Sequence, residues 1–173
     1  LLDVHALARA GIENLAVRFS GGLAAGLFWY VLLGLPGLFA SRCLSLLRDM
    51  LHAQGAHFGK AACGLEAAAH FIPERISALM LGFACLFLPG CRPFRALGLA
   101  LAQPVTGAVN APSIAALAGG LDLSLAGPLS PYASPEWIGT GSARASPEHL
   151  RRTLLLYGIA SILLLLSLGL ALG

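Results

Sequence analysis

The chain has 173 residues and a net charge of +3, and 57% of its residues are hydrophobic whereas only 11% are charged. Soluble domains carry roughly 25% charged residues, so this composition excludes an ordinary water-soluble domain and predicts an all-α integral membrane protein. Its lysine and arginine residues are scattered and do not alternate with aromatic residues, which excludes a nucleic-acid-binding surface. The length fits a single membrane domain over residues 1–173.

The first predicted helix covers residues 4–19, where apolar and charged side chains recur at helical spacing. This amphipathic pattern is typical of a helix that lies at a membrane surface. Ser20 and the glycine pair after it are predicted to end the helix. Since the sequence opens on Leu1 without a signal-peptide pattern, we expect the chain to be the carboxy-terminal part of a longer protein.

Three later runs are apolar enough to cross a bilayer, and two polar loops separate them. The predicted spans cover residues 23–40, 72–88 and 153–173, and the polar loops cover residues 41–71 and 103–150. Pro36 interrupts the first run, which therefore forms either one broken span or two short re-entrant helices. Ser146 as N-cap and Pro147 as first helical residue mark the start of the last helix.

The polar loops and their borders contain further predicted helices. These cover residues 42–52, 59–70, 94–102 and 111–127, the last of them rich in small residues. Because residues 94–102 are too few to cross a bilayer, we expect residues 72–102 to enter it and return as a hairpin. The arginines that flank the loops place them on the cytoplasmic side of a multi-pass inner-membrane protein, by the positive-inside rule.

Metal binding is not predicted from the cysteine and histidine residues. Cys43, Cys63, Cys85 and Cys91 show no C-x-x-C spacing and have no histidine at ligand spacing. We therefore expect them to be small buried hydrophobic side chains, and we assign no metal ligand. The sequence has no G-x-x-x-x-G-K-[ST] loop, so nucleotide binding of the P-loop type is not predicted either.

A dense polar motif precedes the last span. Residues 136–141 read Glu-Trp-Ile-Gly-Thr-Gly, and Ser146-Pro147-Glu148 and Arg151-Arg152 follow. This order resembles the end of the cobinamide-phosphate synthase family (CobD/CbiB), which reads Pro-Trp-Ile-Gly-Asp-Gly and then Pro-x-Asp/Glu-Ile-Arg-Arg. Further segments similar to the family occur in the same order: Leu27-Phe28-Trp29-Tyr30, Phe58-Gly59, Ile72-Pro73-Glu74-Arg75, Gln103-Pro104 and Asn110-Ala111-Pro112. The resemblance covers essentially the whole chain.

The resemblance implies an enzyme of cobalamin biosynthesis. The expected reaction joins adenosylcobyric acid to aminopropanol or its phosphate by an amide bond, with ATP and Mg²⁺ as cofactors, to give adenosylcobinamide or its phosphate. The expected partners are therefore the corrinoid substrate, aminopropanol or its phosphate, membrane lipid and other membrane proteins of the corrin pathway.

Candidate site residues follow from matching positions. The candidate catalytic residues are Glu13, Asp49, Glu66 and Arg75, of which the first and third fall on acidic positions of the family. The candidate substrate-binding residues are Asn110, Trp137, Gly139, Gly141 and Arg151. Each has a structural alternative: a solvated carboxylate, a snorkelling arginine, an interfacial tryptophan or an ordinary glycine turn.

Several acids of the family are missing from this chain. Val17, Arg18 and Gly21 stand where the family has glutamate, asparagine and aspartate, and Arg48 and Thr140 each replace an aspartate. These departures favour an alternative function, in which a homologue without catalysis acts as a sensor or assembly partner, as AmpE-like signalling proteins do. The sequence therefore leaves two functions open.

Overall fold

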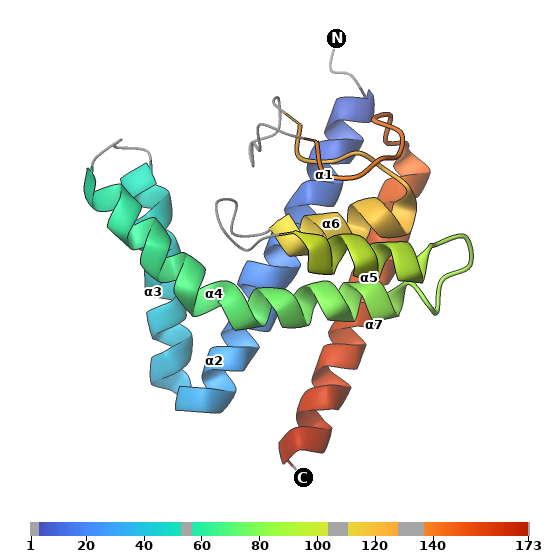
Figure 1. Ribbon diagram of the computed structural model, residues 1–173. Helices are drawn as coiled ribbons and strands as arrows, with labels where there is room; N and C mark the ends of the chain where they lie inside the picture. Colours follow the sequence, from blue (N-terminus) through green and yellow to red (C-terminus); the bar gives the residue numbers. More distant parts are fainter. Residues whose placement is uncertain (1–3, 53–56, 104–110, 128–136, 173) are drawn as a thin grey trace.

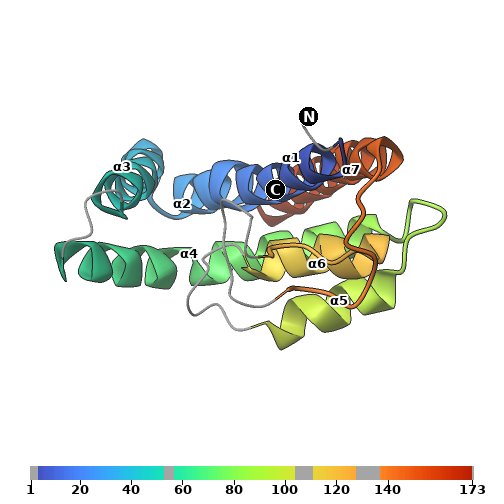
Figure 2. The same cartoon turned by 90° about the horizontal axis from the view of Figure 1, so that it is seen from above.

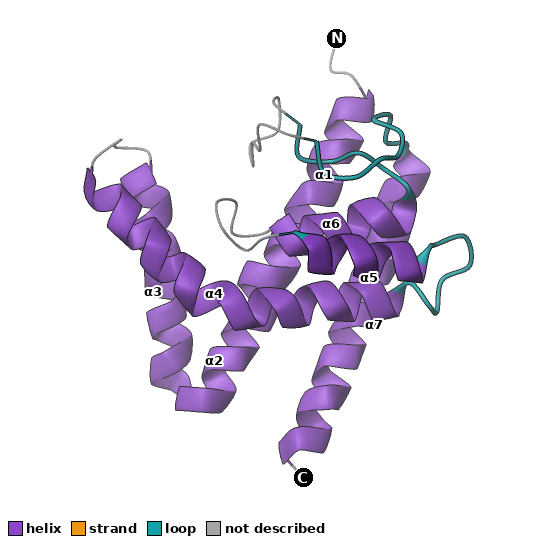
Figure 3. Ribbon diagram, viewed as in Figure 1, coloured by secondary structure: helices purple, strands orange, loops and turns teal. Residues whose placement is uncertain are grey.

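The computed structural model describes residues 4–52, 57–103, 111–127 and 137–172. Helices make up most of these residues: α1 Val4–Val17, η1 Arg18–Ala24, α2 Ala25–Leu33, α3 Leu35–His52, α4 His57–Ala84, α5 Pro93–Ala102, α6 Ala111–Leu121 and α7 Pro147–Leu172. Extended pairing within the described ranges is limited to two isolated bridges, Leu123 with Ser142 and Leu125 with Ile138. The all-α prediction is confirmed, as Figure 3 shows.

The helices form two crossing layers. The first layer holds α1, α2, α3 and α7, and the second holds α4, α5 and α6 (Figures 1 and 2). Helices α1 and α7 run side by side in the same direction, whereas α5 returns along the second half of α4, as the predicted hairpin requires. The layers meet where α4 packs against η1, α3 and α7 and where α6 packs against α1, whereas α5 packs on α4 and α6 within its own layer.

The first helix does not end at the glycine pair, so that prediction is wrong. Residues Arg18–Ala24 form a π-helical segment that joins α1 and α2 into one continuous helix. The wider π turn accommodates the glycines without breaking the helix. The Arg42 guanidinium from α3 donates hydrogen bonds to the carbonyl oxygens of Gly21, at 3.3 Å, and Gly22, at 2.5 Å. These bonds satisfy carbonyls of the widened turn.

The apolar run 23–40 falls on two antiparallel helices. Gly34 has φ of +70°, a left-handed conformation that glycine adopts without strain, and it reverses the chain between α2 and α3. Helix α3 packs closely against α2, since a Cβ at Gly37 would lie only 2.5 Å from the carbonyl oxygen of Trp29. The run is therefore broken at Gly34 rather than at Pro36, and its first half is the end of the long helix Val4–Leu33 rather than a separate short helix.

Helix α4 merges two predicted elements, residues 59–70 and the run 72–88, and ends at Ala84. Pro73 lies inside the helix rather than opening a new one, although it removes one backbone hydrogen bond. The Ser77 hydroxyl donates to the carbonyl oxygens of Pro73 and Glu74, each at 2.9 Å, just after this position. Packing of α4 against α3, α5, α6 and α7 holds the helix together through the proline.

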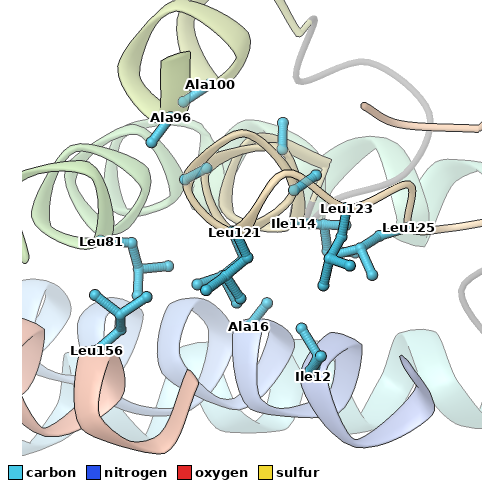
Figure 4. Close-up of a cluster of buried hydrophobic side chains, with 14 of the residues drawn as sticks. Ile12, Ala16, Leu81, Ala96, Ala100, Ile114, Leu121, Leu123, Leu125 and Leu156 are labelled. Atoms are coloured by element: carbon cyan, nitrogen blue, oxygen red, sulfur yellow. The ribbon is translucent and has the colours of Figure 1, made fainter. Parts of the chain in front are cut away.

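The core centres on α6, in which every residue is buried. Figure 4 shows its side chains between those of α1, α4, α5 and α7. Small residues bring the backbones close together, because a Cβ at Gly119 would lie 2.6 Å from the carbonyl oxygen of Arg95 on α5. The predicted helix 111–127 is too long: α6 ends at Leu121, since Asp122 with φ of +56° turns the chain into extended residues.

The start of α7 is as predicted. The Ser146 hydroxyl accepts a hydrogen bond from the backbone N–H of His149 at 3.4 Å, and Pro147 is the first helical residue. Among the described helices, Val4–Leu33 and Pro147–Leu170 are long and apolar enough to cross a membrane by length and composition. Large apolar side chains are exposed along both, including Leu32, Leu33, Leu165, Leu166 and Leu170.

Candidate functional site

A polar pocket of about 170 Å³ lies where α4 crosses the π-helical segment. It is lined by Val17, Arg18, Gly21, Gly22, Arg42, Ser45, Glu66 and His70, and we call it the η1 pocket. Pockets for whole small molecules are roughly 300–1,000 Å³, so the η1 pocket fits one polar group of a larger substrate.

The irregular helix explains why polar groups gather here. π-helical turns inside α-helices are often found at functional sites because they change the direction of side chains and carbonyls. Arg18 opens the π segment and donates from Nε to Asn14 at 3.2 Å, so its guanidinium is held on the pocket side of the helix. A Cβ at Gly22 would meet no atom within 4 Å, which leaves open space beside this turn.

The acid and base of the pocket come from α4. Glu66 and His70 are one helical turn apart, and their Oε1 and Nδ1 atoms are 3.9 Å apart. Both side chains are nearly fully buried, at 1% and 3% relative exposure. A carboxylate next to an imidazole can orient the ring. This pair is able to accept a proton from a bound amine.

Glu13 is not among the residues that line the η1 pocket. It is buried in α1, and its Oε1 accepts a hydrogen bond of 2.8 Å from the backbone N–H of Ala126. Glu74, which sequence analysis did not select, does the same in the second layer: its Oε1 accepts from the backbone N–H of Ser113 at 3.0 Å. Both carboxylates therefore tie a helix to the backbone of α6 or of the segment after it.

Arg75 lies on α4 outside the pocket lining. Its guanidinium donates to the carbonyl oxygens of Ala100, at 2.8 Å, and Gln103, at 2.9 Å. These oxygens belong to the end of α5, where a helix lacks internal donors and carries partial negative charge. Arg75 therefore caps α5, and this contact accounts for a charge within an apolar run.

The motif before the last span packs against the segment after α6. Trp137 is 45% exposed, with the guanidinium of Arg9 5.1 Å from its ring centroid, and a Cβ at Gly127 would lie 2.6 Å from the ring. A Cβ at Gly139, whose φ is +100°, or at Gly141 would overlap the carbonyl oxygen of Leu123 or Asp122. The space beside both glycines is thus filled by this chain.

Thr140, at the position of a family aspartate, belongs to a surface cluster. Its hydroxyl accepts a hydrogen bond from Arg95, whose other nitrogen contacts a carboxylate oxygen of Asp122 at 2.6 Å. Arg92 lies 3.4 Å from the other oxygen of that carboxylate. All three charged side chains are more than one third exposed, so the cluster is a solvated link between α5 and the motif.

The remaining predicted residues do not meet in one place. Arg151 is an exposed residue of α7. Asn110 and the side chain of Asp49 lie outside the described residues. Among the described cysteines, Cys85 is buried as predicted, whereas Cys91 is only half-buried and Cys43 is exposed on α3.

The structure brings together residues that sequence reasoning missed. Arg42, Ser45 and His70 line the η1 pocket, yet none was selected as a candidate site residue. The four-residue spacing of Glu66 and His70 was a readable signal, since it places both side chains on one helix face. The position of Arg42 beside the pocket could not be predicted from the sequence, because it depends on the reversal of the chain at Gly34.

Comparisons with known proteins agree with the motifs. The family described as CobD/Cbib protein matches residues 1–157. A protein from Sinorhizobium sp named cobalamin biosynthesis protein CobD is 36% identical over 161 residues, 86% of this chain and 49% of the relative. Proteins of the same name from Rhizobium meliloti and Rhodobacter capsulatus are 35% and 31% identical, over 73% and 98% of this chain and 41% and 55% of the relatives. The chain thus spans about half the length of these relatives. No solved structure matches it significantly.

Proposed function

The chain belongs to the CobD/Cbib family, and from this membership we propose that it acts in cobalamin biosynthesis as part of an amide-forming ligase. The proposed reaction joins adenosylcobyric acid to aminopropanol or its phosphate at the expense of ATP. The observation that supports it best is the η1 pocket. Part of its wall comes from residues 13–22, the segment that corresponds to the family's acidic motif.

Amide formation from a carboxylate needs activation, because a carboxylate is a poor acceptor of nucleophiles. ATP supplies the phosphoryl or adenylyl group that converts the corrinoid carboxylate into a reactive ester. The amine nitrogen then attacks the carbonyl carbon, the C–N bond forms, and the bond to the phosphate or adenylate oxygen breaks. One proton leaves the nitrogen, so the enzyme needs a base near the amine.

The η1 pocket contains groups for two of these tasks. Glu66 with His70 accepts the proton that the attacking amine loses. Arg18 and Arg42 stabilise negative charge on the leaving phosphate, since guanidinium groups bind phosphate oxygens through paired N–H donors. The amino alcohol is small enough to enter the pocket while the corrinoid remains outside it.

We also propose that the protein is a multi-pass inner-membrane protein with its active face toward the cytoplasm. Two helices of sufficient length and the exposed leucines along them support this placement. ATP and the corrinoid are cytoplasmic compounds, and the η1 pocket would have to open on that side.

Complementation tests the proposed activity. The full-length protein should restore cobinamide formation in a strain that lacks its own synthase, and Glu66→Ala should abolish it, because the pocket then loses its carboxylate. Glu148→Ala is the matched control: it removes an exposed glutamate of α7 that forms an ion pair with Arg152 in its own helix. Failure of the intact protein to restore synthesis, despite normal amounts in the membrane, would contradict the proposal.

A second candidate function is a homologue without catalysis that senses a ligand or assembles with other proteins. The contact between Arg95 and Thr140 favours it, since a family aspartate has become a neutral partner in a surface link. In that case the full-length protein would bind corrinoid in a pull-down but would not form cobinamide. Cobinamide formation by the purified protein would exclude it.

A further inference from the structure

The η1 pocket carries more positive than negative charge. Its lining includes two guanidinium groups, from Arg18 on η1 and Arg42 on α3, and a single carboxylate, that of Glu66. The carboxylate lies beside His70, a further group that becomes cationic on protonation. A pocket with this composition attracts anions.

The two arginines are fixed in place by neutral groups. Arg42 donates to the carbonyl oxygens of Gly21 and Gly22, and Arg18 donates from Nε to the Asn14 side chain. Neither forms an ion pair with any carboxylate in the part of the chain that the structure describes. Their positive charge is therefore held at the pocket without being neutralised by a carboxylate of these residues. Because both side chains are already fixed, little side-chain entropy is lost when a ligand binds there.

Magnesium, which the family resemblance implies, does not fit these residues. Mg²⁺ prefers an octahedral set of oxygen ligands, with one or two carboxylates from the protein. The described residues contain no group of three or more histidine, cysteine or acidic side chains that could hold a metal. In the η1 pocket two guanidinium groups would repel a dication beside the single carboxylate of Glu66.

We propose that the η1 pocket binds a phosphate group directly through Arg18 and Arg42, with no magnesium ion between the phosphate and the protein. This proposal rests on the proposed function, because it concerns the same pocket. The phosphate belongs either to a soluble phosphorylated substrate or to a lipid headgroup. Val17 and Gly21 replace two acids of the family, and Arg18 replaces its asparagine. On this proposal the replacements change phosphate recognition from metal-mediated binding to direct binding.

Calorimetry with inorganic phosphate tests the proposal. The full-length protein in neutral detergent should bind phosphate in the presence of EDTA. Arg18→Gln should weaken binding about tenfold or more, because a charge-assisted pair of hydrogen bonds is lost. Arg9→Gln is the matched control, since Arg9 lies on the same continuous helix but stacks on Trp137. Arg42→Lys, which keeps a charge but loses the paired donors, should also weaken binding if the fold is intact by circular dichroism.

A lipid arm distinguishes the two sources. In nanodiscs, phosphatidic acid should compete with soluble phosphate if the headgroup is the natural ligand, and Arg18→Gln should remove that competition. Absence of competition assigns the pocket to a soluble phosphate. The proposal would be overturned if phosphate binding required Mg²⁺ or if no phosphate bound. It would also be overturned if Arg18→Gln and Arg42→Lys bound phosphate as tightly as the wild type. Complementation is scored separately, so phosphate binding without cobinamide synthesis contradicts the proposed function but not the phosphate site.

Discussion

Two regions that resemble family motifs, residues 137–141 and residues 13–22, have different roles in the structure. Residues 137–141 keep the family pattern at all but one position, and their glycines and tryptophan pack against the segment after α6. Residues 13–22 have lost most of the family's polar residues, yet their second half forms the π-helical wall of the η1 pocket. Similarity to a family motif therefore does not show whether a residue packs in the core or lines the candidate site.

The difference has a physical basis. A glycine that lies against a carbonyl oxygen tolerates no side chain at all, so that any replacement affects folding. A pocket wall is open on one side, and a charged residue there changes what is bound without disturbing the core. Substitutions in the closing motif, in the η1 pocket and at two buried or capping residues outside both can test this contrast.

The largest effect should come from Gly141→Ala. The added Cβ would overlap the carbonyl oxygen of Asp122, so we expect a loss of about 3 kcal/mol in stability and little folded protein in the membrane. Gly158→Ala is the control, because a Cβ there meets nothing within 4 Å and alanine favours the helix. Thermal unfolding in detergent, followed by circular dichroism, measures both. A stable but inactive Gly141→Ala protein would show instead that the glycine contacts substrate.

His70→Ala should leave the fold intact and lower cobinamide formation about 100-fold, because the pocket loses half of its proton-accepting pair. The assay is initial-rate synthesis by membranes that contain the full-length protein. His5→Ala is the control: that histidine contacts the carbonyl oxygen of Ala145, away from the pocket lining, at 2.7 Å. Equal rates for His70→Ala and the wild type would contradict the proposal that the η1 pocket supplies the base of the reaction.

Glu13 separates the sequence prediction from the structural one. Glu13→Gln keeps an oxygen that accepts the Ala126 N–H and should retain activity within about threefold. Glu13→Ala leaves the buried N–H unpaired and should cost about 2 kcal/mol of stability. Rates and unfolding curves of the two variants are compared. Complete inactivity of a well-folded Glu13→Gln protein would restore Glu13 as a catalytic residue.

Arg75→Ala should have the smallest effect of the four. It removes the donors at the end of α5, and we expect a loss of about 1 kcal/mol, since water replaces part of the capping at this partly buried site. The unfolding midpoint in detergent should fall by a few degrees, while the rate of cobinamide formation per folded molecule stays unchanged. Arg144→Ala, which removes an exposed arginine from the loop before α7, is the control. An inactive but stable Arg75→Ala protein would contradict the capping role.

Local patterns predicted what depends on neighbours in sequence. The N-cap at Ser146 and the short helix that begins at Pro93 require only adjacent residues, and both are present. The break at Gly21 and Gly22 was predicted from local propensity too, but here a distant arginine satisfied the carbonyls and the helix continued. The predicted break between residues 59–70 and the run 72–88 is also absent. Helix α4 continues through Pro73 because its packing against four helices outweighs one missing hydrogen bond.

By itself the sequence determined that this protein is all-α, that it is rich in apolar helices and that it belongs with the CobD/CbiB pattern, because composition, periodicity and motif order are properties of the chain alone. The tertiary structure decided which polar residues share a pocket. Glu66 and His70 meet Arg18 and Arg42 only because the chain reverses at Gly34 and α4 crosses the π-helical segment. Which charged side chains share a site depends on contacts between residues far apart in the sequence. These contacts are set by packing between the two layers rather than by the spacing of residues within one helix.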